Sequence, residues 1–226
     1  MSPPPALESL LTTDPLLSQS YAFIKDYMSH YDASHDISHI QRVVRLAHSI
    51  FLASPASPPL DLRTVLLAAL LHDVGDKKYL APNQDPTTLV SSTLLSFSCP
   101  PALAEKVQAI CLGVSYSTEI KNPAKTAELV REFPELAVVQ DADRLDAIGA
   151  VGVGRMFTYG GAKTERDLAG TMEHLDEKLV RLEGMMKTDE GRRLARERTE
   201  RLRVFRGWWV EETGGEGGEE DGQGGE

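Results

Sequence analysis

The apolar positions of this chain recur every three to four residues, which is the spacing of amphipathic helices, and no stretch sustains the alternation of a strand. Segments rich in Pro, Gly or Ser separate these periodic runs. The pattern therefore predicts an all-α fold. The helices expected from it lie at residues 15–30, from about 36 to 53, and at 62–73, 87–97, 101–112, 123–133, about 136–150, 149–161, 164–186 and 188–211.

The predicted helix at 62–73 ends in two polar residues, His72 and Asp73, whose presence its apolar face does not explain. The face formed by Leu62, Val65, Leu66 and Ala69 continues to His72, and Asp73 follows directly. An imidazole and a carboxylate at the end of a buried stripe carry a desolvation penalty, which a bound metal ion would offset. The alternative is a helix that simply emerges into solvent at His72.

Two further predicted helices interrupt their apolar faces in the same way. His39 opens a stripe that continues through Val43, Leu46, Ala47 and Ile50. Asp143 falls on a face with Leu136, Val139 and Ala150. The short proline-rich connection at 54–61 favours antiparallel packing of the two histidine-bearing helices, and this would bring the polar residues together.

The sequences around these three sites resemble those of the HD-domain metal-dependent phosphohydrolase superfamily. The resemblance rests on SHDISHIQRV, LLHDVGDKKY and QDADRLDAIGAVGVGRMFTYGG, with HLDEKLVRLEGMMKTDEGRRLARER near the C-terminus, and it spans most of residues 20–210. These motifs are similar to those of small stand-alone members from bacteria and fungi, which act as nucleotide pyrophosphohydrolases. The resemblance implies a single-domain HD helical bundle with a mononuclear metal site between helices.

Carried over residue by residue, the resemblance implies the metal ligands His39, His72, Asp73 and Asp143. Asp143 is preferred to Asp141 because the superfamily often has the form Ala-Asp-Arg-Leu at this motif. Two residues on a helix differ by roughly 200° in direction, so Asp141 and Asp143 cannot both face one ion. Asp146 could still reach the site.

Two imidazoles and two carboxylates suit one divalent ion, with manganese preferred and magnesium, iron, cobalt, nickel or zinc as alternatives. Such a site keeps open positions for water and substrate, which is typical of catalytic metal centres. Binuclear relatives carry extra histidines between the His-Asp pair and the last aspartate, and this chain has none from Asp73 to Asp143. A mononuclear phosphohydrolase is therefore favoured over a diiron oxygenase or a cyclic-dinucleotide hydrolase.

Polar residues next to the His-Asp pair are candidates for the rest of the chemistry. Asp76 is the expected general acid or base, because superfamily members often carry an acid at this offset; a C-terminal cap or a surface aspartate is the alternative. Lys77 and Lys78 could hold the phosphate chain, although lysines are also common at helix ends for electrostatic reasons.

Further candidates lie beside the first and last ligands. His35 and Asp36 could contact the metal ligands or the substrate, and Asp36 is equally suited to cap the helix that follows it. Arg42 and Arg144 could bind phosphate oxygens, or could serve as internal ion-pair partners.

The glycines at 149, 152 and 154 could suggest a phosphate-binding loop. No strand precedes them, so we interpret them as small residues that allow close helix packing, with Tyr159-Gly160-Gly161 ending that helix.

Length and composition indicate one domain. We expect a flexible N-terminus at 1–14, the HD domain at 15–211 and a disordered acidic, glycine-rich tail at 212–226. The net charge is −10, and the seven acids from Glu211 onward leave about −3 for the rest, so tight nucleic-acid binding is not expected.

Cys99 and Cys111 are expected to be reduced buried thiols. The N-terminus has no signal-peptide pattern and no stretch is long and apolar enough for a bilayer, so the expected location is the cytoplasm, with nuclear entry left open.

These features predict a metal-dependent phosphohydrolase that cleaves a small-molecule nucleotide, a nucleoside triphosphate, to a monophosphate and pyrophosphate. The alternatives are a nucleoside monophosphate phosphatase and a non-catalytic nucleotide-binding regulatory protein. A homodimer is left open.

Overall fold

The computed structural model describes residues 6–30, 36–55, 59–76, 80, 84–164 and 166–214, and within them the chain is helical, with no strand. The all-α prediction is therefore confirmed. The α-helices are α1 (Leu7–Thr13), α2 (Pro15–Tyr27), α3 (Ile37–Ala53), α4 (Leu62–Leu71), α5 (Leu89–Ser96), α6 (Pro101–Val114), α7 (Tyr116–Lys121), α8 (Pro123–Glu132), α9 (Glu135–Asp146), α10 (Gly149–Lys163), α11 (Leu168–His174) and α12 (Asp189–Thr213). Shorter turns of 3-10 or π helix are η1 (Met28–His30), η2 (Leu175–Leu179) and η3 (Val180–Met185).

Helix α4 lies at the centre of the bundle and packs against α2, α3, α6 and α9. Every residue of α4 from Thr64 to Leu71 is buried, which agrees with its almost uninterrupted apolar sequence. A helix that is apolar on all sides must be surrounded by other helices. The neighbours of α4 therefore converge on one core, and the ends of α3, α4 and α9 are brought together there.

Aspartates cap three of the helices that build this core, α2, α3 and α4. The carboxylate of Asp14 accepts hydrogen bonds from Leu16 N and Leu17 N at the start of α2, and Asp61 accepts one from Thr64 N in α4. At the start of α3, Asp36 Oδ1 accepts from the amides of Ser38 and His39, at 3.0 and 3.2 Å. Such caps satisfy amide groups that the first turn of a helix leaves without partners.

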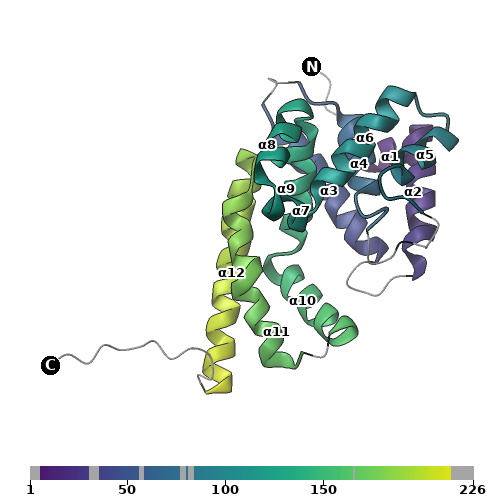
Figure 1. The fold of residues 1–226 in the computed structure, drawn as a ribbon. Helices are drawn as coiled ribbons and strands as arrows, with labels where there is room; N and C mark the ends of the chain where they lie inside the picture. The colour runs from purple at the N-terminus through teal and green to yellow at the C-terminus, as the bar shows by residue number, and fades with distance from the viewer. Residues whose placement is uncertain are drawn as a thin grey trace.

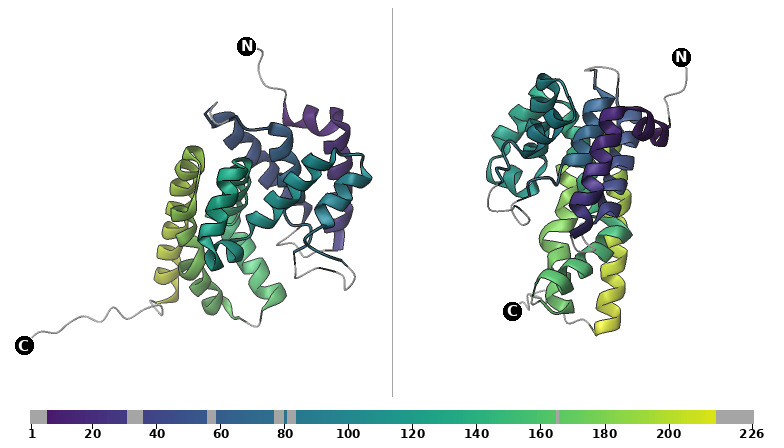
Figure 2. Two further views of the ribbon diagram at one scale, coloured as in Figure 1. Left: turned by 45° about the horizontal axis from the view of Figure 1, so that its top comes forward. Right: turned by 90° about the vertical axis from the view of Figure 1, so that its right-hand side faces the viewer.

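The last third of the chain forms a lateral arm. Figure 1 shows α12 running along one edge of the bundle, with α10 and α11 beside its lower half, and Figure 2 shows the same arrangement from two further directions. Helix α12 packs against α9, α10 and η3. Asp141 holds the start of α12 in place, because its carboxylate accepts hydrogen bonds from the amides of Lys187 and Thr188.

Several predicted boundaries differ from the structure. Helix α9 ends at Asp146, and a turn with Gly149 at φ 74° separates it from α10, so Ala150 does not share a helix face with Asp143. The glycines at 160 and 161 do not end α10, which continues to Lys163. A Cβ on Gly160 would lie 2.6 Å from Thr171 Oγ1, so this glycine, which was expected to end the helix, allows α10 and α11 to approach closely. The packing role expected for Gly154 was wrong, because a Cβ there would have no neighbouring atom within 4 Å.

The remaining differences concern short elements. Helix α7 was not predicted, and the segment 164–186 is divided into α11, η2 and η3 where one helix was expected. Within the N-terminal segment expected to be flexible, residues 7–13 form α1, which packs on α2. The glycine-rich tail from residue 215 onward lies outside the described residues. Cys99 and Cys111 are buried and free, in agreement with the prediction of reduced thiols.

Candidate metal centre

His72 and Asp73 lie where α4 ends. His72 is the C-terminal cap of α4, and its side chain is only 1% exposed. The helix therefore does not emerge into solvent at this residue. Gly75 adopts φ 87°, a conformation that favours glycine, and this allows the chain to turn sharply directly after the pair. A Cβ on Gly75 would also lie 3.3 Å from Pro86 Cα.

His39 reaches the same place from the first turn of α3. Its side chain is also 1% exposed, and its Nε2 lies 3.2 Å from Nε2 of His72. The third member of the group is Asp143 on α9, whose Oδ1 lies 3.6 Å from Nε2 of His39 and 3.7 Å from Nε2 of His72. The candidate ligand atoms of these three residues all lie within 4.8 Å of one another.

Asp73 completes the set of acids at this point. Its Oδ2 lies 3.4 Å from Nε2 of His39, and its Oδ1 lies 3.5 Å from Nε2 of His72. The structure thus brings together all four residues that the sequence implied as ligands. The side chains of Asp73 and Asp143 are 19% and 29% exposed, so the acidic side of the group is the side that faces solvent.

The ring nitrogens that point away from this group are hydrogen-bonded. Nδ1 of His39 lies 2.8 Å from Asp146 Oδ2, and Nδ1 of His72 lies 2.9 Å from the carbonyl oxygen of Ala69. Both partners are acceptors, so each Nδ1 carries a proton, and each Nε2 presents a lone pair when its ring is neutral. Two lone pairs facing each other across 3.2 Å repel one another unless a proton or a cation lies between them. Nitrogens bound to one ion at about 2.1 Å have a similar separation, so the residues fit a metal ion.

The raised pKa of His72 also indicates that the surrounding charges favour a cation at this position. Burial lowers the pKa of this imidazole, but the negative charges of Asp73 and Asp143 outweigh burial and raise its pKa to about 9. These acids favour a positive charge between them, which a divalent ion would supply more strongly than a proton.

Asp146 supports the centre from behind. This buried carboxylate accepts the hydrogen bond from His39, and Nε and Nη2 of Arg42 bind its two oxygens at 2.7 and 3.0 Å. Nη1 of Arg155 lies 3.1 Å from Oδ2. Burial alone would raise the pKa of Asp146, but the hydrogen bonds from His39 and Arg42 hold it well below its usual range. A permanently ionised Asp146 fixes the ring orientation and tautomer of His39.

Asp141 does not face the centre. It is fully buried, and its hydrogen bonds go to the amides of Lys187 and Thr188 and to the hydroxyl of Thr188. This agrees with the expectation that Asp141 and Asp143 point in different directions. Asp146, which the sequence left open, contacts a candidate ligand and not the candidate metal position.

Other predicted site residues have structural partners. Asp36 caps α3, which was the alternative to a substrate contact. Arg144 is 2% exposed; its guanidinium donates to Glu119 and to the carbonyl of Met185, so the structure favours the internal ion pair over the phosphate contact. Arg42 is 31% exposed and binds Asp146.

Asp76 is partly exposed just beyond the His-Asp pair, and its amide donates to Asp73 O at 3.2 Å. His35, Lys77 and Lys78 lie outside the described residues. Arg155, in the glycine-rich α10, was not predicted, and no motif or periodicity in the sequence pointed to it.

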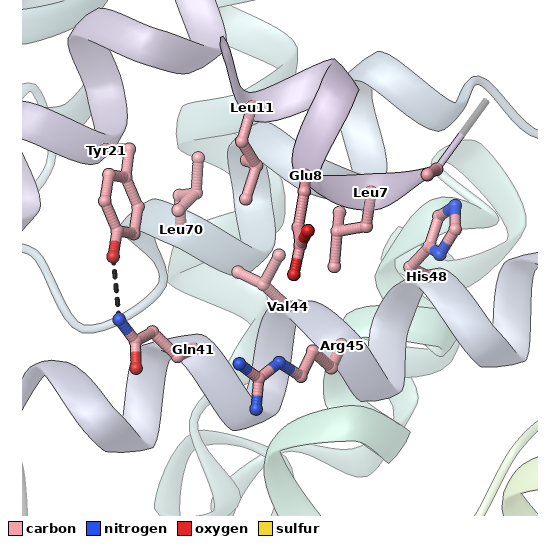
Figure 3. A pocket seen from close by; sticks show the side chains of 10 residues that line it. Leu7, Glu8, Leu11, Tyr21, Gln41, Val44, Arg45, His48 and Leu70 are labelled. Atoms are coloured by element: carbon pink, nitrogen blue, oxygen red, sulfur yellow. Dashed lines mark hydrogen bonds between the residues drawn. The ribbon is translucent and has the colours of Figure 1, made fainter.

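A cavity of about 560 Å³ lies on another face of α3 (Figure 3). Leu7, Leu11, Val44 and Leu70 supply its apolar lining, and Glu8, Arg45 and His48 contribute polar groups. None of the four candidate ligands lines it, so the chemistry of the metal centre is not located there.

Comparisons with known proteins agree with this geometry. The sequence profile of the HD domain matches residues 36–148, which include all four candidate ligands. The chain is 34% identical to the uncharacterised protein YpgQ of Bacillus subtilis over 183 residues, covering 80% of this chain and 85% of YpgQ.

Solved structures show the same likeness. The crystal structure of B. subtilis YpgQ in complex with ADP superposes with a TM-score of 0.67 at 32% identity, covering 88% of this chain and 96% of that one. A protein from Lactobacillus plantarum gives a TM-score of 0.72 at 28% identity, with 89% and 98% coverage. An HD-superfamily hydrolase from Bacillus thuringiensis gives 0.65 at 27% identity, with 87% and 96% coverage. The matched profile, the identity to YpgQ and the His-His-Asp group together show that the chain belongs to the HD domain family.

Proposed function

We propose that this protein is a metal-dependent phosphohydrolase that cleaves nucleoside triphosphates to a nucleoside monophosphate and pyrophosphate. The observation that carries the proposal is the approach of Nε2 of His39 to Nε2 of His72 at 3.2 Å beside two carboxylates. This group is suited to one divalent ion in a site that is partly open to solvent.

His39, His72 and Asp143 would hold the ion, with Asp73 as a fourth ligand and manganese as the preferred metal. When bound, a divalent ion lowers the pKa of a coordinated water and stabilises the charge that develops on phosphoryl oxygens. Asp146 keeps His39 in the tautomer that can ligate, and Ala69 O does the same for His72.

Residues after the His-Asp pair would supply proton transfer and charge. Asp76 would act as general acid or base, since it follows Asp73 by three residues at the exposed end of the turn. Lys77 and Lys78 would neutralise the leaving pyrophosphate. These three roles rest on the resemblance of the sequence and on the position of the turn.

The relatives support a nucleotide as the substrate. YpgQ binds ADP in its crystal structure, and the B. thuringiensis relative is described as a hydrolase of the HD superfamily. The absence of a basic excess in the chain argues against a nucleic acid as the substrate.

Two alternatives make different products. A nucleoside monophosphate phosphatase would release orthophosphate from monophosphates, and a regulatory protein would bind nucleotides without turnover. The test is a release assay for pyrophosphate and orthophosphate over a panel of nucleotides with each divalent metal. His72→Asn should abolish metal-dependent pyrophosphate release. His174→Gln, which changes a histidine at the end of α11 that is not a candidate ligand, should retain it. Turnover by His72→Asn equal to that of the parent would remove the proposed site from the reaction.

A further inference from the structure

A second groove lies between η3 and α12, and none of the candidate metal ligands lines it. Its volume is about 470 Å³. The residues that line it are Val180, Arg181, Glu183, Gly184, Arg192, Arg196 and Arg203. Four guanidinium groups and one carboxylate therefore surround the same space. None of these residues belongs to the metal centre.

The arginines that α12 contributes to this groove lie close together on the helix. Arg192 and Arg203 pair with acids one turn away, Asp189 and Glu200, but among the described residues Arg196 has no such partner. Arg192 and Arg196 form a like-charge pair at i,i+4, which is a destabilising arrangement on a helix. Spacings of four and eleven residues place Arg192, Arg196 and Arg203 on one face.

Two of the four arginines lack an acidic partner. Across the part of the chain that the structure describes, the side chains of Arg181 and Arg196 make no hydrogen bond or ion pair. Arg203 makes only long contacts, at 3.4 Å to Glu183 and 3.4 Å to Glu200. Arg192 is better held, because it donates to Asp189 and to the carbonyls of Met186 and Lys187. The groove therefore combines one fixed guanidinium with two that are available to a ligand.

We propose that this groove is a second binding site, which takes the polyphosphate chain of a small anion. Guanidinium groups bind phosphate oxygens through paired hydrogen bonds, and several of them in one groove match several phosphates. Val180 and Gly184 offer little surface for stacking, so the phosphate chain and not a base is what the groove recognises. A nucleic acid is a poor fit, because Glu190, Glu197 and Glu200 line the neighbouring surface of α12.

The site is joined to the core by one turn of the chain. Arg192 binds the carbonyls of Met186 and Lys187, and the amide of Lys187 binds Asp141 on α9 at 2.9 Å. Asp141 precedes the candidate ligand Asp143 by two residues. The groove therefore lies against the turn that anchors the helix carrying Asp143.

The experiment titrates the full-length chain with inorganic triphosphate by calorimetry, with divalent metals chelated. The variant Arg181→Ala/Arg196→Ala removes two charges from the groove. The control Arg131→Ala/Arg201→Ala removes the same charge from exposed arginines outside it. We expect the groove variant to bind at least about tenfold more weakly and the control to bind like the parent. Equal affinity in the two double variants, with folding verified by circular dichroism, would overturn the proposal.

Three further arms identify the ligand and separate this site from the proposed active site. His72→Asn should bind triphosphate in the groove like the parent, whatever its activity. A non-hydrolysable nucleoside triphosphate should bind the groove with the affinity of inorganic triphosphate, and adenosine should not bind. A peptide with the sequence of residues 211–226 tests an acidic protein segment instead. Binding of this peptide that depends on Arg181 and Arg196, combined with triphosphate binding that does not, would reject the polyphosphate assignment.

Discussion

His39 and His72 are 33 residues apart, yet their Nε2 atoms face each other at 3.2 Å while each Nδ1 is bound to an acceptor. The pairing follows from the antiparallel contact of α3 with α4 and from the position of the histidines at adjacent ends of these helices. Two imidazole nitrogens that face each other at this distance repel one another unless a proton or a cation lies between them. The end of α4 is therefore a candidate site for a cation.

The link between Asp146 and His39 predicts the behaviour of Asp146→Asn. The amide cannot accept the hydrogen bonds of His39, Arg42 and Arg155 as the carboxylate does, so His39 loses its fixed tautomer. Loss of such a partner typically weakens metal affinity roughly 10- to 100-fold. Titration of the metal-free protein with manganese measures the change. Asp176→Asn, which alters an exposed acid paired with Arg206, is the control. Unchanged affinity in Asp146→Asn would show that Asp146 does not support the centre.

The turn after the His-Asp pair predicts a cost for Gly75→Ala. At φ 87°, alanine is strained, and its Cβ would meet Pro86 at 3.3 Å. We expect a loss of about 1 kcal/mol or more in the free energy of unfolding, and weaker metal binding because His72 and Asp73 shift with the turn. Gly154→Ala, inside α10, is the matched control. A Cβ at this position would have no neighbouring atom within 4 Å, so the substitution should stabilise the protein slightly. Urea unfolding distinguishes the two, and a stability of Gly75→Ala equal to that of Gly154→Ala would contradict the strain argument.

The ion pair of partly buried Glu119 with buried Arg144 predicts a dependence of stability on pH. Burial raises the pKa of Glu119, but hydrogen bonds and charge from Arg144 and Lys187 outweigh it and lower the pKa below its ordinary value of 4.5. The contribution of the ionised carboxylate is therefore complete above pH 4.5 and is lost as the pH falls through the lowered pKa. Glu119→Gln should cost about 3 kcal/mol at neutral pH, because Arg144 stays buried without its partner.

Urea unfolding of the parent and of Glu119→Gln from neutral pH down to about pH 3.5 tests this sign. The difference between their unfolding free energies should shrink as the pH falls below 4.5. A difference that stays constant over this range would mean that the ion pair does not stabilise the fold.

The two helices that carry the histidines could be predicted from sequence because α3 has one clear apolar face and α4 is apolar almost throughout. His72 ends the apolar run of α4 and His39 begins the apolar face of α3, so both histidines stood out against apolar neighbours. The capping role of Asp36 was also within reach, because caps depend on local sequence.

What the sequence could not give depends on how separate helices are rotated against one another. The packing of α9 on α3 decides whether Asp146 contacts the ion or His39. The apolar periodicity of the sequence does not predict that packing. Arg155 reaches Asp146 only because the turn at Gly149 redirects α10, and its surroundings in sequence are glycine-rich and uninformative. Helix α7 is six residues long and has no buried residue, so it leaves no apolar period to detect.

The central claim is that a single cation binds between His39 and His72. Anomalous diffraction from a crystal grown with manganese, with data collected on both sides of the metal absorption edge, tests it most directly. The account predicts one anomalous peak per chain, about 2.0–2.3 Å from Nε2 of both histidines and within reach of Asp143. A crystal that shows no such peak there, at a manganese concentration that supports turnover, would contradict it.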